Sequence, residues 1–250
     1  MLPIKPTERL RIKKSILSGI LALVAGSLLA ADSTTKDDVK AATKALADNY
    51  SWHTTTAAPN AGGGGGRFRP GPTDGKTAAG TTWLEMTRGT NVTDAVLTGG
   101  KGAVKMQDSW QSLADLAADD GGGGFNPRMF MGRMLQNFKA PAAQAGELAD
   151  GAKELAKADD AISGDLTEDG AKALLSFGPP GGGGPAISNA KGSVKFWVKD
   201  GKLAKYELHV SGSIDFNGNT RDVDRTTTVE IKDVGTTKVE VPEDAKSKLK

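Results

Sequence analysis

The chain has 250 residues, of which 38% are hydrophobic and 25% charged, 33 are glycine and none is cysteine. This composition is typical of a globular protein with room for a sizeable core, and the lack of cysteine excludes disulfides, thiolate metal sites and lipid attachment through a cysteine. The net charge is only +2, so nothing in the electrostatics favours nucleic-acid binding.

The first 31 residues have the layout of a secretory signal peptide. Five basic residues precede an uncharged run from Ser15 to Ala31: Lys5, Arg9, Arg11, Lys13 and Lys14. The apolar part would span about 24 Å as a helix, short of the roughly 30 Å hydrocarbon core of a membrane. We expect residues 1–31 to be a signal peptide cleaved near Ala30-Ala31, with an uncleaved anchor as the alternative. Residues 32–250 would then form a single exported domain, in a bacterial periplasm.

The domain opens with a predicted helix and a predicted strand. Thr35 to Asp48 carries apolar residues at helical spacing and acidic residues in its first turn, and Tyr50 to Thr56 is rich in β-branched threonine. A Gly/Pro-rich loop is expected over residues 57–80. Three strands then follow as a meander: Thr82 to Arg88, Asn91 to Thr98 and Ala103 to Gln107.

The middle of the chain is predicted to be mostly helical. Helices are expected from Ser109 to Ala118, from Asn126 to Lys139, over parts of Ala140 to Ala158, and from Leu166 to Phe177, with a short strand at Ile162. Gly/Pro-rich loops are expected at residues 119–126 and 178–191. The Asn126 to Lys139 helix carries an apolar stripe that either packs as ordinary core or covers the sheet as a movable lid.

The last quarter alternates apolar and polar residues with a period of two, which predicts a one-sided antiparallel sheet. Asp200-Gly201 and Asn217-Gly218 are hairpin signals between its long strands. A last strand is expected over Thr237 to Val241, followed by a helical turn from Glu243 to Leu249. The predicted class is therefore α+β, with an antiparallel, strongly curved sheet (an open half-barrel) and helices packed on its concave side.

No catalytic or metal site can be read from the sequence. The glycine runs lack the Lys-Ser or Lys-Thr of a phosphate loop, and the Asp215-Phe216-Asn217-Gly218-Asn219 segment lacks the distal Glu of a calcium loop. His53 and His209 stand alone on predicted strands, and there is no nucleophile elbow. We expect neither a cofactor nor a metal, and no enzymatic activity.

The closing strands resemble those of exported proteins with the LolA-like fold, which include the periplasmic lipoprotein carrier and the LppX/LprG-type lipid-binding lipoproteins. The resemblance rests on Val194 to Glu207, Thr228 to Gly235 and the Val239-Glu240-Val241-Pro242 ending. It implies an unclosed antiparallel barrel with helices that plug its concave side, and hence a hydrophobic cavity. This chain differs in lacking a lipidation cysteine and in carrying glycine-rich insertions.

The function we expect is binding or carriage of a hydrophobic ligand: an acyl chain, a lipid or a lipoprotein anchor. Envelope proteins or a membrane surface would be further partners, with no nucleic acid. The alternative is a structural or interaction module of the cell envelope with a solid core. The residues expected to line the cavity are apolar residues of the strands and of the predicted lid helix: Leu84, Met86, Met131, Met134, Leu135, Phe138, Val194, Phe196, Tyr206, Leu208, Val210, Val229 and Ile231.

Overall fold

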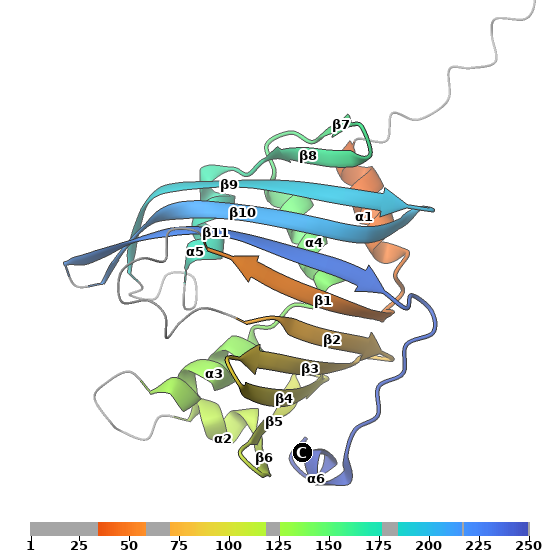
Figure 1. Ribbon diagram of the computed structural model, residues 1–250, viewed down its shortest axis with the longest axis vertical. Helices are drawn as coiled ribbons and strands as arrows, with labels where there is room; N and C mark the ends of the chain where they lie inside the picture. Colours follow the sequence, from red (N-terminus) through yellow and green to blue (C-terminus); the bar gives the residue numbers. More distant parts are fainter. Residues whose placement is uncertain (1–34, 59–70, 119–125, 177–184, 217, 250) are drawn as a thin grey trace, which may run out of the picture. The chain divides into compact units, whose positions relative to one another are not determined.

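The computed structural model describes residues 35–58, 71–118, 126–176, 185–216 and 218–249, all within the compact unit Thr34–Lys250 (Figure 1). These residues form an α+β fold with an eleven-stranded antiparallel sheet that is strongly curved and not closed into a barrel. The predicted fold class is confirmed. The predicted signal peptide, residues 1–31, lies outside the described residues.

The sheet consists of two meanders that meet at its centre. The strand order is β6-β5-β4-β3-β2-β1-β11-β10-β9-β8-β7. The first meander contains β1 (Asn49–Ala57), β2 (Thr73–Ala78), β3 (Thr81–Arg88), β4 (Asn91–Thr98), β5 (Lys101–Met106) and β6 (Ser109–Ser112). The second contains β7 (Ala156–Ala158), β8 (Ala161–Asp165), β9 (Ala186–Lys199), β10 (Lys202–Phe216) and β11 (Asn219–Lys232). Pairing of β1 with β11 joins the two halves, with Trp52 opposite Ile231.

Side chains alternate between the two faces of the sheet, and each face packs against different helices. We call the face that carries Trp52, Leu84 and Phe196 the inner face, and the opposite one the outer face. The helices are α1 (Thr35–Lys44), α2 (Leu113–Ala117), α3 (Pro127–Gln136), α4 (Pro141–Gly151), α5 (Glu168–Leu175) and α6 (Glu243–Lys246). Buried residues of α1 to α5 belong to the same apolar cluster as the inner face, so these five helices cover that face.

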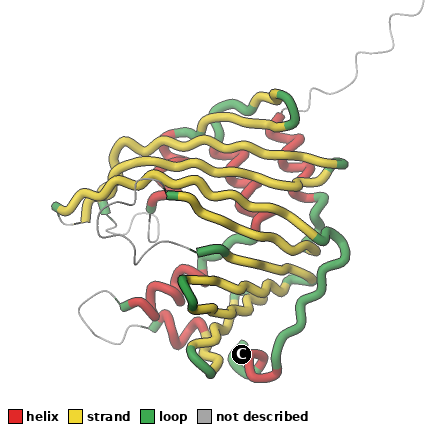
Figure 2. The backbone as a smooth tube through the Cα atoms, in the orientation of Figure 1, coloured by secondary structure: helices red, strands yellow, loops and turns green. Residues whose placement is uncertain are grey.

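The C-terminal helix α6 packs on the outer face, which differs from the expectation that all helices share one side. Ala245 is fully buried against Val96, Ala103 and Trp110, with Val241 beside them. Figure 2 shows the loop that runs from the end of β11 to this helix. The segment Thr237 to Val241 is not a strand: it leads from the turn after β11 to α6, and Thr237 N donates to Asn49 Oδ1 (2.9 Å).

The Asp200-Gly201 hairpin signal in the last quarter is confirmed, whereas Asn217 of the second signal lies outside the described residues, between the paired strands β10 and β11. Asp200 and Gly201 connect β9 to β10 with φ values of 51° and 72°, the two left-handed residues that a type I′ turn requires. The register that follows puts Phe196 opposite Tyr206 and Val194 opposite Leu208, so the alternating apolar residues all face the helices.

Three segments that were predicted as loop or helix are strands. Thr73–Ala78 is strand β2 rather than part of a loop over 57–80, because β1 and β3 satisfy its backbone on both sides despite its polar sequence. Ser109–Ser112 is strand β6, and the helix cap is Ser112, whose hydroxyl accepts from Asp115 N (3.1 Å). Strand β9 begins at Ala186, within the predicted loop 178–191; residues 59–70, 119–125 and 177–184 lie outside the described residues.

Candidate functional site

The residues predicted to line a cavity are brought together on the inner face. Eight are buried in one apolar cluster: Leu84, Leu135, Val194, Phe196, Tyr206, Leu208, Val210 and Val229. Four more are partly buried and pack against it: Met86, Met131, Phe138 and Ile231. Met134 is the exception, with 44% of its surface exposed, because helix α3 turns it away from its buried neighbour Leu135.

Helix α3 reaches the sheet through its C-terminal half. Asn126 caps it by accepting from Arg128 N (2.9 Å) and Met129 N (3.3 Å), and Pro127 occupies the first turn. Gly132 allows a close crossing of α2, since a Cβ atom there would lie 2.8 Å from Ala117 N. This crossing places Leu135 and the following Phe138 against the inner face.

A hollow of about 240 Å³ lies between the end of α3 and the turns of β3, β4 and β5. Its lining is mixed: the apolar side chains are Leu97, Leu113, Leu135 and Phe138, and the polar ones are Thr82, Thr98, Lys101 and Gln136. The Phe138 ring stacks on Trp52, with ring centroids 6.3 Å apart and planes 15° from parallel. Phe138 thus stands between the hollow and the buried indole of Trp52, which is 3% exposed.

The inner face of β9 and β10 is filled by the chain's own leucines. A Cβ atom at Gly192 would lie 2.8 Å from Leu166 Cδ1, and one at Gly212 would lie 2.7 Å from Leu175 Cδ1. Each glycine thus leaves the space that a leucine side chain occupies. This half of the inner face is packed closely, whereas the hollow lies at the other half.

Two buried phenols hold α4 on the inner face. The Tyr50 hydroxyl accepts from Ala142 N (3.1 Å), and the Tyr206 hydroxyl donates to Gln144 Oε1. Burial raises the pKa of Tyr50 to about 12 and also raises the pKa of Tyr206. Both phenols therefore stay neutral at physiological pH and serve as hydrogen-bonding groups rather than as bases.

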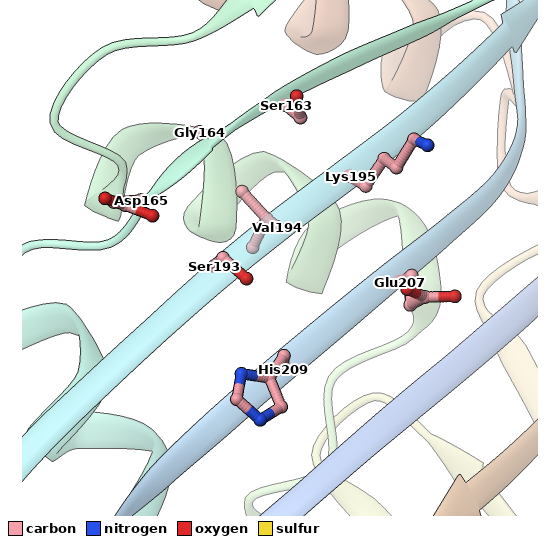
Figure 3. Close-up of a pocket in the computed structure, with 8 residues that line it drawn as sticks. All are labelled: Ser163, Gly164, Asp165, Ser193, Val194, Lys195, Glu207 and His209. Carbon is pink, nitrogen blue, oxygen red and sulfur yellow. The ribbon is translucent and has the colours of Figure 1, made fainter.

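A second hollow, of about 310 Å³, lies on the outer face over β8, β9 and β10 (Figure 3). Its polar lining consists of Ser163, Asp165, Ser193, Lys195, Glu207 and His209. Only His209 was considered as a site residue from the sequence, because these residues are the solvent-facing half of an alternating pattern. Asp165, Ser193 and His209 occupy one row across neighbouring strands. His209 Nε2 pairs with Asp224 Oδ1 (2.9 Å), and in the described part of the chain no hydrogen bond joins His209 to Ser193. The row therefore lacks the contact that activates a serine nucleophile.

Other polar groups considered from the sequence have local partners. His53 Nδ1 pairs with Asp74 Oδ1 (2.8 Å) on the outer face. Asp215 accepts from Gly218 N (2.8 Å) and Thr220 Oγ1 (3.1 Å), so its carboxylate closes a hairpin turn. Within the described ranges, no group of three or more His, Asp or Glu side chains could hold a metal ion. None of the helices described there is long and apolar enough to cross a membrane.

No protein-family model matches the chain, and no curated protein matches it. Among solved structures, the chain is similar at 14% identity to a bifunctional dehydratase-cyclase domain from ambruticin biosynthesis, over 80% of this chain and 82% of that one. The TM-score of that superposition is 0.19, so this likeness bears on neither fold nor activity.

Proposed function

We propose that this chain is an exported protein that binds or carries a hydrophobic ligand against the inner face of its sheet. The observation that carries the proposal is the partly apolar hollow beside Phe138, at the half of the inner face that the chain's own leucines do not fill. The LolA-like resemblance of the closing strands is part of this proposal, as are periplasmic location and delivery to envelope proteins or a membrane surface.

The energetics favour an acyl chain that displaces Phe138. A stacked aromatic pair contributes about 0.5–1.5 kcal/mol beyond its burial. Each methylene moved from water into an apolar site contributes about 0.8 kcal/mol, so a few methylenes offset the loss of the Phe138–Trp52 stack. The hollow alone is smaller than most ligand pockets, and an acyl chain that reaches Trp52 therefore needs Phe138 to move.

The second candidate is a structural or interaction module of the cell envelope. Its support is the close packing of Leu166 and Leu175 over Gly192 and Gly212 on one half of the inner face. Under this alternative, Phe138 is a fixed core residue, and the hollow is a surface depression without a ligand.

Lipid extraction tests the two candidates directly. The protein is purified from its native compartment, extracted with organic solvent and analysed by mass spectrometry. We expect a stoichiometric lipid from the wild type. The variant Gln136→Phe, which narrows the mouth of the hollow, should carry several-fold less. Arg133→Phe, exposed on the same helix but outside the lining, is the matched control and should carry as much as wild type.

Repeated absence of lipid from the wild type would support the solid module. Equal lipid in the Gln136→Phe and Arg133→Phe variants would place any ligand elsewhere. Cell fractionation with N-terminal sequencing tests export separately: we expect a periplasmic protein that begins near Asp32.

A further inference from the structure

Arg225 is a cation on the inner face of the sheet. It lies on β11 directly opposite Val210 of β10, whose side chain is fully buried in the apolar cluster. Cross-strand partners project from the same face, so Arg225 points toward the helices rather than to the outer surface. Its Nη2 donates to the backbone oxygen of Leu174 at the end of α5 (2.9 Å).

The guanidinium group of Arg225 has more donors than partners. It carries five N–H groups, and the carbonyl of Leu174 takes one of them. In the described segments, no carboxylate lies within ion-pair distance of it. Burial lowers the pKa of Arg225 because desolvation disfavours the charged form. The guanidinium group nevertheless stays protonated at physiological pH. Arg225 is half-buried, so its remaining N–H groups are partly accessible, and an anion bound there would offset the cost of partly desolvating the cation.

The neighbours of Arg225 combine hydroxyl groups with apolar side chains. Thr227 lies two residues along the same strand and face, with its Oγ1 3.3 Å from Thr56 Oγ1. Leu208, opposite Thr227, is buried in the apolar cluster, and Val223 packs against that cluster. These surroundings suit a ligand with an anionic head and an apolar body.

A strip of half-buried side chains leads from Arg225 across the middle of the inner face. It consists of Thr227 on β11, Thr54 and Thr56 on β1, Thr73 on β2 and Met86 on β3. Arg225 lies six residues along β11 from Ile231, the strand partner of Trp52. At ~3.3 Å per residue this separation is roughly 20 Å, so a ligand that contacts both Arg225 and Trp52 has a long chain.

We propose that Arg225 binds the carboxylate of a long-chain fatty acid through the N–H groups that Leu174 leaves free. A carboxylate matches the planar fork of the guanidinium in a bidentate pair, which an alcohol or ester cannot form. This inference rests on the proposed function and narrows its ligand class from any hydrophobic molecule to an anionic acyl chain.

The test compares palmitate with hexadecanol, which differ only in the head group, by isothermal titration of the purified protein. We expect the wild type to bind palmitate roughly 10- to 100-fold more tightly, the range expected for hydrogen bonds to a charged group. Arg225→Met should lose this preference and keep its affinity for hexadecanol. Arg225→Lys, which keeps a cation without the fork, should retain part of the preference. Arg88→Met, which removes an exposed arginine, should bind as wild type does.

The outcomes separate this inference from the proposed function. Equal binding of palmitate and hexadecanol by the wild type overturns the inference and leaves the proposed function standing, and binding of neither overturns both. If Arg225→Met weakens both ligands equally, Arg225 is a structural residue only. Thermal melting checks folding: the Met variant should melt close to the wild-type temperature, because the half-buried charge that it removes lacks a carboxylate partner.

Discussion

The indole of Trp52 lies directly over Gly75 on the neighbouring strand. A Cβ atom at Gly75 would stand 2.0 Å from Cζ2 of Trp52. We therefore expect Gly75→Ala to displace the indole and to destabilise the fold by about 2 kcal/mol, the usual range for overpacking. Gly146→Ala is the control: a Cβ atom at Gly146, inside α4, would lie 4.0 Å from its nearest neighbour Thr43 Oγ1 without a clash, and alanine there should stabilise by up to about 1 kcal/mol. Urea unfolding measures both, and a neutral Gly75→Ala variant would contradict this packing.

Leu135 and Met134 are adjacent on α3, but truncation of Leu135 should destabilise the fold strongly and truncation of Met134 hardly at all. Leu135 is 3% exposed and Met134 is 44% exposed. Leu135→Ala removes a buried side chain and should cost about 2–5 kcal/mol. Met134→Ala should change the free energy of unfolding by no more than about 0.5 kcal/mol. The same denaturant experiment measures both, and a large effect at Met134 would show that α3 packs in a different rotation.

The two buried tyrosines predict that stability falls at alkaline pH. An unfolded tyrosine ionises near pH 10, whereas burial raises the pKa of Tyr50 to about 12. Between these values the unfolded state releases a proton that the folded state retains, so stability is full below pH 10 and falls as pH rises to 12. The loss from Tyr50 is roughly 2–3 kcal/mol, and Tyr206 adds to it in the same direction.

Unfolding free energies measured from pH 9 to pH 12 test this dependence. The Tyr50→Phe variant cannot ionise at this position and should show a shallower fall than wild type. A wild-type profile that stays flat above pH 10 would mean that the phenols reach solvent in the folded state.

The order of the strands could be predicted only where turns and alternation were both present. Asp200-Gly201 and the alternating residues around Phe196 determine the hairpins of β9 to β11, because a shift of one residue would turn every apolar side chain to solvent. Strand β2 has no such pattern, and its existence depends on backbone pairing with β1 and β3. The pairing of β1 with β11 joins residues far apart in the sequence, and no local signal predicts it.

The candidate site was predictable as a surface but not as a cavity. Periodicity identified the apolar residues of the inner face, including Phe138 and Leu135, since burial requires them. Periodicity could not show that Leu166 and Leu175 pack over Gly192 and Gly212, or that a hollow remains beside Phe138. Both features depend on which helix lies over which strand. The role of Arg225 was missed because a charged residue in a threonine-rich strand usually faces solvent.

Fluorescence quenching of Trp52 by a brominated acyl chain tests most directly whether a ligand enters beside Phe138. The protein has four tryptophans, so Trp83, Trp110 and Trp197 are first replaced by phenylalanine. We predict that the brominated chain quenches Trp52 at saturating ligand, whereas acrylamide, which stays in water, does not reach this buried indole. Binding of the chain without quenching, or no binding at all, would contradict ligand entry at the inner face.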